Sequence, residues 1–152
     1  MKKLTFILIA ILTVCASNAV AQTTNVSDAD KAAIKQTALD YIEGWYEGDA
    51  DRMERALHPD LAKRIVRASP DGKYNRLDQM SAMGLVQGVK RGGGKQTPKE
   101  KQQKDITILD AYENSASVKI VASDWIDYLH LAKFGGRWVI VNVLWELKPE
   151  KK

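Results

Sequence analysis

Cysteine is nearly absent from the sequence: its 152 residues include a single one, Cys15, near the N-terminus. An intrachain disulfide needs two cysteines, so no such disulfide can stabilise this fold. Lipidation is an alternative role for this cysteine, because Leu12 stands three residues before it, as in lipoprotein sites. Val14, directly before Cys15, is a poor fit to the small residue that such a site favours. We therefore do not expect lipidation.

Long apolar runs are also lacking. The run Leu4–Val14 is too short for a spanning helix, which needs about 20 apolar residues. It follows the Lys2-Lys3 pair and precedes Ala19–Ala21, and this order is typical of a cleaved signal peptide. The sequence thus predicts a signal peptide at residues 1–21 and one domain over 22–152, exported to the periplasm or secreted. After cleavage we expect no stable membrane span.

Neither sign of charge dominates the chain. It has 23 Lys and Arg against 19 Asp and Glu, a net charge of +4, which loss of the two leader lysines lowers to +2. A nucleic-acid-binding domain usually gathers its basic residues on one face, so we expect no nucleic-acid partner. Histidine is scarce as well, with only His58 and His130, and no spacing typical of a zinc site occurs. We expect no metal and no cofactor.

The first part of the predicted domain has the pattern of helices. Ser27 is a typical N-cap, and apolar side chains then recur at helical spacing up to Glu47, before Gly48. These side chains are Ile34, Ala38, Tyr41, Ile42 and Trp45. A shorter helix, capped by Asp49 or Asp51, is expected to follow as far as Leu57, where Pro59 ends it.

The middle of the chain is less regular. Residues 60–67 fit either a short helix or an extended segment, and Ser69–Gly72 has the composition of a turn. Apolar spacing predicts a third helix over Arg76–Val89. Residues 90–104 are basic and contain the run Gly92–Gly94, which indicates a solvated loop.

From Asp105 onward the apolar period changes from helical to alternating. Residues at every second position are apolar, which is typical of strands: Ile106, Ile108, Val118, Ile120, Ile126, Tyr128, Val139, Val141 and Val143. Short turns are expected at Glu113-Asn114, near Asp124 and at Gly135-Gly136. This pattern predicts an antiparallel meander of four strands. Helices followed by a meander indicate an α+β fold.

Three segments resemble a known family: Ala38–Asp49, Leu57–Leu61 and Asp127–Asn142. Their residues are similar to those of the putative lumazine-binding group of the nuclear transport factor two-like (SnoaL-like) superfamily. The resemblance implies a cone-shaped, cystatin-like fold, with N-terminal helices packed on the concave face of a curved antiparallel sheet around a pocket. The superfamily includes isomerases, dehydratases and non-enzymatic binders, so the resemblance implies a fold and no particular activity.

The last hairpin predicts which residues share a face of the sheet. If Gly135-Gly136 is a two-residue turn, Leu129 opposes Asn142 and Asp127 opposes Leu144. By analogy with the family, the face that carries Asp127 is expected to line the pocket, opposite the first helix. The candidate pocket residues are Tyr41, Trp45, His58, Trp125, Asp127 and Asn142.

Two functions from different classes fit this pocket. The first is non-catalytic binding of a small molecule or a partner. The alternative is a small enzyme of isomerase, dehydratase or hydrolase type, because burial raises the pKa of a carboxyl such as Asp127 and suits it to act as a base. Tyr41 or His58 would then be its acid–base partner. No catalytic residue is assigned, and a purely structural dimerisation module is a third reading.

The other face of the sheet is also apolar and has no helix to cover it. Its residues are expected to be Ile126, Tyr128, Ala132, Val139, Val141, Val143 and Trp145, with His130 among them. Monomeric proteins seldom expose apolar patches beyond a few hundred Å². The pattern therefore predicts a homodimer through this outer face, weakened when His130 is protonated below about pH 6.

Overall fold

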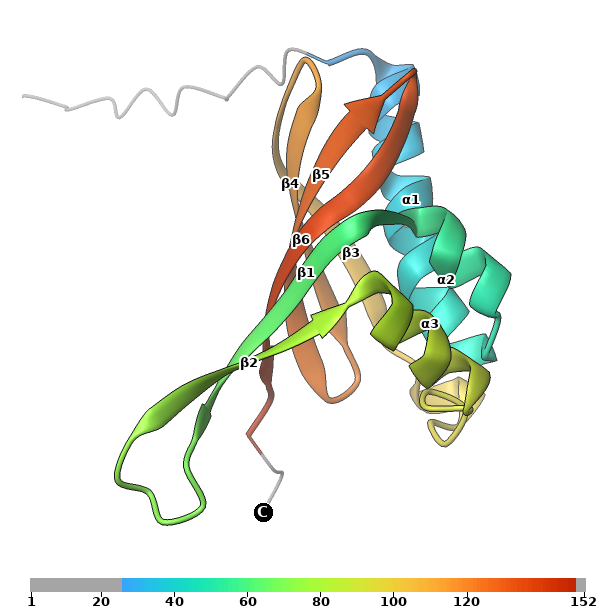
Figure 1. The fold of residues 1–152 in the computed structure, drawn as a ribbon. Helices are drawn as coiled ribbons and strands as arrows, with labels where there is room; N and C mark the ends of the chain where they lie inside the picture. The colour runs from blue at the N-terminus through green and yellow to red at the C-terminus, as the bar shows by residue number, and fades with distance from the viewer. Residues whose placement is uncertain (1–25, 150–152) are drawn as a thin grey trace, which may run out of the picture.

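Three α-helices, one short 3₁₀-helix and six strands make up residues 26–149, the part of the chain that the computed structural model describes (Figure 1). The expected signal peptide and Cys15 lie outside the described residues. The elements in chain order are α1 (Asp28–Glu47), α2 (Ala50–Ala56), β1 (Leu57–Ala68), β2 (Asn75–Ser81), α3 (Ala82–Lys90), η1 (Lys99–Lys101), β3 (Lys104–Tyr112), β4 (Ser115–Ala122), β5 (Trp125–Phe134) and β6 (Arg137–Leu147). No helix in this part of the chain is both long and apolar enough to cross a bilayer.

The first helix begins and ends where the sequence predicts, and the second ends at Ala56, so that Leu57 and Pro59 belong to β1. The Ser27 hydroxyl accepts a hydrogen bond from the Asp30 N–H at 3.1 Å, which caps α1. Gly48 ends α1 in the left-handed conformation, with φ of 70°, which favours glycine. The Asp49 carboxylate caps α2 by accepting from the Arg52 N–H at 2.9 Å.

The middle of the chain folds differently from expectation. Residues 60–67 belong to the long strand β1. The third helix predicted over Arg76–Val89 is wrong in its first half, where the chain forms β2 and pairs with β1. The reason is a cap: the Ser81 hydroxyl accepts a hydrogen bond from the Gly84 N–H at 3.1 Å, so α3 starts after it. The sheet therefore has two strands more than the predicted meander.

The six strands form one sheet in the order β2-β1-β6-β5-β4-β3. Neighbouring strands are antiparallel, except that β1 and β6 run parallel. The helices lie on one face of the strongly twisted sheet, and the β1–β2 hairpin projects beyond the body (Figure 1). We call the helix-covered face the inner face and the opposite one the outer face. This arrangement confirms the expected α+β architecture.

A bulge in β6 corrects the predicted register of the last hairpin. Gly135 and Gly136 have φ of 55° and 82°, as the expected two-residue turn requires. Leu131 opposes Ile140 as predicted, but His130 opposes Asn142, so Val141 is an extra residue in β6. One extra residue reverses the facing of every later side chain in the strand.

Beyond the bulge, the two faces of β6 are exchanged relative to expectation. Val143 is fully buried in the core and Trp145 packs against it, whereas Leu144 is exposed. The Trp145 ring contacts the inward side chain of Lys63. The expected outer-face set therefore loses Val143 and Trp145, and gains Leu144.

Candidate functional site

A cavity of about 290 Å³ lies between the helices and the inner face of the sheet. Its lining comes from all three helices and from four strands: Tyr41, Trp45, Met53, Lys63, Met80, Leu85, Asp124, Trp125, Trp145 and Leu147. Most of these side chains are apolar or aromatic. The volume is near the lower end of the range for small-molecule sites, about 300–1,000 Å³.

A buried ion pair stands at the wall of this cavity. The Lys63 ammonium donates to the Asp127 carboxylate at 2.6 Å, and the two residues are 6% and 0% exposed. The second carboxylate oxygen accepts a hydrogen bond from the Trp125 indole N–H at 2.6 Å. Lys63 reaches the cavity directly, whereas Asp127 lies behind it. Removing a charged group from water is costly unless it contacts an opposite charge, and here each of the two charges contacts the other.

Tyr41 completes the polar group at this wall. Its hydroxyl oxygen accepts a hydrogen bond from Lys63 Nζ at 2.7 Å. Burial, together with the charge of Asp127, raises the pKa of Tyr41 well above its ordinary value, so the phenol stays protonated. Burial also lowers the pKa of Lys63, because a charged amine is poorly solvated there, although the Asp127 carboxylate opposes this shift. The cavity thus presents one amine and one phenol among apolar rings.

Trp45 forms another wall, and a glycine-rich turn holds it in place. Trp45 meets Trp125 edge to face, with ring centroids 6.4 Å apart and planes at 82°. A Cβ on Gly93 would lie 2.6 Å from the Trp45 ring, and one on Gly94 would lie 2.1 Å from the Trp45 carbonyl oxygen. Only glycine permits such an approach. Most of the expected loop is exposed, but Gly93 and Gly94 within it pack closely against Trp45.

Three of the six candidate pocket residues line the cavity, and a fourth lies behind it. Tyr41, Trp45 and Trp125 contribute to the lining, and Asp127 meets Tyr41 through Lys63. The predicted grouping of α1 aromatic residues with the start of β5 is therefore present in the fold.

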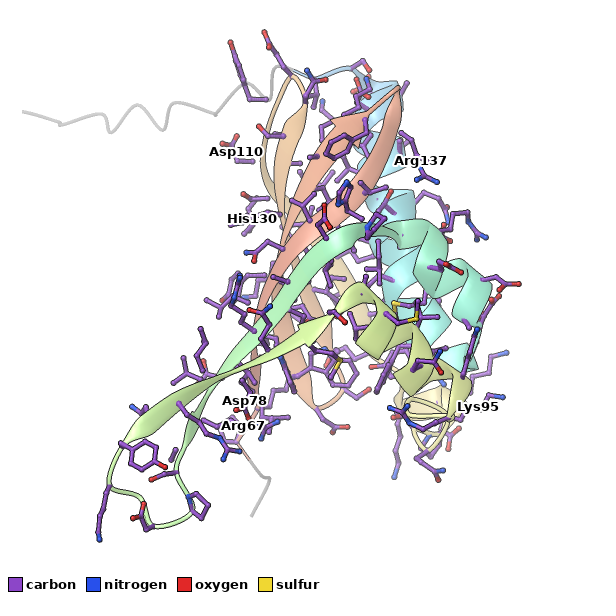
Figure 2. The ribbon with its side chains drawn as sticks, viewed as in Figure 1. Arg67, Asp78, Lys95, Asp110, His130 and Arg137 are labelled. Atoms are coloured by element: carbon purple, nitrogen blue, oxygen red, sulfur yellow. The ribbon has the colours of Figure 1, made fainter. Side chains whose placement is uncertain are left out.

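The other two candidates lie elsewhere. Asn142 faces outward because of the bulge at Val141, and its amide nitrogen lies 3.3 Å from His130 Nδ1. Figure 2 labels His130 on the outer side of the sheet. His58 stacks on Phe134 with ring centroids 4.9 Å apart and is not among the lining residues. The expectation that Asn142 and His58 face the pocket is wrong in both cases.

A larger hollow, of about 520 Å³, lies between α2, α3 and the start of β1. Its charged lining residues are all at the surface: Asp51, Glu54, Arg55 and Arg137. None of them is a buried group with an unusual environment. The chemistry therefore favours the smaller cavity, where buried titratable groups meet an apolar lining.

Lys63 is the site residue that the sequence analysis missed. The pattern of residues 60–67 fits either a short helix or an extended segment, so it does not predict which way the Lys63 side chain faces. The available signal was the alternation Leu61, Lys63, Ile65, which places a cation at an inward strand position between two apolar residues. Its partner Asp127 lies 64 residues further along the chain, so no local pattern connects them.

Comparison with known proteins identifies a family. A family described as putative lumazine-binding matches residues 29–146. No match was found among curated proteins.

Solved structures share the fold. A nuclear transport factor two-like protein of unknown function from Shewanella baltica is 20% identical, with a TM-score of 0.60, over 83% of this chain and 100% of that one. A similar protein from Methylobacillus flagellatus is 20% identical, with a TM-score of 0.59, over 82% and 97% of the two chains. A protein with a cystatin-like fold from Nostoc punctiforme is 14% identical, with a TM-score of 0.54, over 83% and 96%. At such identities the likeness establishes the fold alone.

Proposed function

The chain belongs to the putative lumazine-binding family, and from this premise we propose that it is a non-catalytic binding domain for a flat heteroaromatic molecule such as lumazine. The observation that carries the proposal is the aromatic cavity with one buried cation at its wall. Trp45, Trp125 and Trp145 supply ring surface, and Lys63 supplies a hydrogen-bond donor. Flat bicyclic rings with carbonyl oxygens complement both features.

The geometry of Asp127 supports binding over acid–base catalysis. Both of its oxygens already accept hydrogen bonds, from Lys63 and from Trp125. A general base must lie within hydrogen-bond distance of the substrate proton that it removes, and Asp127 is not among the residues that line the cavity. His58, one of the two expected acid–base partners, stacks on Phe134 instead. Of the three groups that the enzyme alternative names, only Tyr41 lines the cavity.

The test is titration of the purified protein with lumazine, followed by calorimetry. Two exposed methionines provide a matched pair of variants: Met80 lines the cavity, and Met83 lines the larger hollow. Met80→Trp places an indole where the ligand would lie and should weaken binding at least tenfold. Met83→Trp should leave the affinity unchanged.

Three results would refute the proposal. One is wild-type protein that binds no lumazine at millimolar concentration. Another is Met80→Trp binding as tightly as wild type. The third is a loss of binding in Met83→Trp alone, which would place the ligand in the larger hollow.

Export is a further part of the proposal and depends on residues 1–21. The charged start, the short apolar run and Ala19–Ala21 support cleavage after Ala21. The intact mass of the exported protein should correspond to residues 22–152. A mass that begins at Cys15 with added lipid would contradict this.

A homodimer through the outer face is the third part. Val66 opposes Leu77 and Tyr128 opposes Leu144 across neighbouring strands, and all four side chains are more than 40% exposed. A second copy that presents the same patch across a twofold axis would cover all four. Sedimentation at tens of micromolar should give a dimer for the wild type and a monomer for Leu144→Glu. Either a wild-type monomer or a dimeric Leu144→Glu variant would contradict this arrangement.

A further inference from the structure

Lys63 is the only buried lysine among the residues that the structure describes. Its amine combines three properties: it borders a cavity, it contacts a carboxylate, and it contacts a phenol. We infer that Lys63 is a covalent capture site for small aromatic aldehydes, which it binds as an imine. This inference shares the cavity of the proposed binding function but does not require that lumazine be the ligand.

Burial brings the Lys63 amine closer to its reactive, unprotonated form, although the adjacent Asp127 carboxylate stabilises the ammonium. An unprotonated amine is the nucleophile, and burial among apolar rings stabilises that form relative to the ammonium. The pKa of Lys63 is accordingly lowered from the ordinary lysine value. Lys63 Nζ lies 4.6 Å from the centroid of the Trp145 ring, which also borders the cavity. An aldehyde carbon lying over that ring would face the amine.

Both partners of Lys63 have a part in moving protons. Asp127 Oδ1, at 2.6 Å, accepts the proton that the ammonium gives up. Tyr41 Oη, at 2.7 Å, is a protonated phenol that can donate to the carbonyl oxygen. Both groups already contact Nζ, the atom that attacks the aldehyde.

The reaction balances without an oxidant or a reductant. Nζ forms a bond to the carbonyl carbon, and the electron pair of the C=O π bond moves to oxygen, which takes a proton. The resulting carbinolamine loses that oxygen as water after a second protonation. The two protons removed from the nitrogen equal the two that leave in water. An aldehyde and an amine thus become an imine and one molecule of water.

The cavity selects the class of aldehyde. At about 290 Å³ and lined by three tryptophans, it suits one or two fused aromatic rings and excludes bulky substituents. Most other described lysines are exposed on helices, turns and strand ends, where no aromatic cavity gathers the aldehyde, as for Lys95 at the surface in Figure 2. Capture should therefore be selective for Lys63.

The experiment uses benzaldehyde with sodium cyanoborohydride, which converts an imine to a stable secondary amine. The purified protein is treated at pH 7.5, and adducts are located by intact mass and peptide mapping. We expect one adduct, at Lys63, to form at least tenfold faster than any adduct on a surface lysine. The yield at Lys63 should reach half its maximum at a pH below that of the surface lysines.

Three variants sharpen the result. Lys63→Arg keeps a cation beside Asp127 but cannot form the imine, and it should lose the fast adduct. Tyr41→Phe keeps the ring but removes the proton donor, so it should slow the reaction severalfold. Met80→Trp narrows the cavity and should slow it too. Labelling of surface lysines alone, or an undiminished fast adduct in Lys63→Arg, would overturn the inference.

Lumazine titration of the same preparation separates this inference from the proposed function. Lumazine has no aldehyde group, so its binding does not depend on imine formation. Binding of lumazine without a Lys63 adduct would overturn capture and leave the binding function standing. A Lys63 adduct without lumazine binding would support capture and refute the proposed ligand.

Discussion

Two clusters of charged side chains hold helices in place, one against the sheet and one against another helix, and they differ in depth. The inner cluster is the Lys63–Asp127 pair with the Tyr41 phenol, enclosed between α1 and the sheet. The surface cluster surrounds Arg52 of α2. The guanidinium of Arg52 contacts three carboxylates of α1, those of Asp40, Glu43 and Glu47.

The two clusters differ in how much a lost contact destabilises the protein and in whether they can bind a ligand. In the surface cluster Arg52, Asp40 and Glu43 each have more than one charged partner and keep some access to solvent, so losing one contact leaves alternatives. In the inner cluster each charge has one charged partner, and both members of the pair are buried. The depth of a cluster and the position of its charges relative to a cavity, more than the number of its ion pairs, therefore determine whether it can bind a ligand. The inner one borders a cavity, and the surface one fastens α1 to α2.

The sharpest test of the comparison is to remove the inner cation. Lys63→Met should lower the free energy of unfolding by about 3–5 kcal/mol, because it leaves the Asp127 carboxylate buried without its partner. Denaturant titration at pH 7 measures the change. The double variant Lys63→Met with Asp127→Leu removes both charges and should recover most of the loss. A double variant as unstable as the single one would mean that packing, and not charge, dominates this site.

The next effect concerns the wall of the cavity and involves no charge. Gly94→Ala should destabilise the protein by about 1–3 kcal/mol, because the new methyl group meets the Trp45 backbone. Gly88→Ala is the matched control: its Cβ would contact the same tryptophan ring at an ordinary 3.5 Å and lies within a helix. Its expected effect is neutral or stabilising. Thermal unfolding of both variants should separate them, and equal melting temperatures would exclude the close approach.

Removal of the surface cation should have a smaller effect. Arg52→Ala is expected to lower the free energy of unfolding by about 1–2 kcal/mol at low salt, with the difference shrinking at high salt. Arg55→Ala, at a more exposed position 3.4 Å from Asp40, should cost less than about 0.5 kcal/mol. Should the loss for Arg52→Ala match that for Lys63→Met, depth would not be the property that distinguishes the clusters.

The smallest effect is expected at Asp30, a carboxylate near the surface at the start of α1. Hydrogen bonds from Lys133, Trp138 and Ser27 lower its pKa from 3.8 to about 2. Because the folded pKa lies below the unfolded one, this carboxylate stabilises the fold above about pH 4, and the contribution is lost as the pH falls towards 2. Asp30→Asn should therefore be less stable than wild type at pH 7 and approach it near pH 2. Denaturant midpoints at pH 7, 4 and 2.5 measure this, and a constant difference would contradict it.

Local signals in the sequence determined those helices and hairpins whose ends are marked by capping or turn residues. Ser27, Gly48 and Asp49 cap helices through contacts within four residues. Gly135-Gly136 specifies a tight turn by its positive φ. The order of helices before strands, with the family resemblance, then led to the right fold class.

Tertiary structure decided the rest, because strands are stabilised by partners that are distant in sequence. The apolar spacing of residues 76–81 predicts a helix, but these residues form β2 because they pair with β1, a partner that their own sequence does not reveal. The bulge at Val141 moved Asn142 outward and Trp145 inward, although nothing in the local sequence announces an extra residue. Lys63 became a cavity residue only when the fold brought Asp127 to within 2.6 Å of it. A buried charge is stabilised by its partner, and in this protein only the tertiary structure brings that partner close.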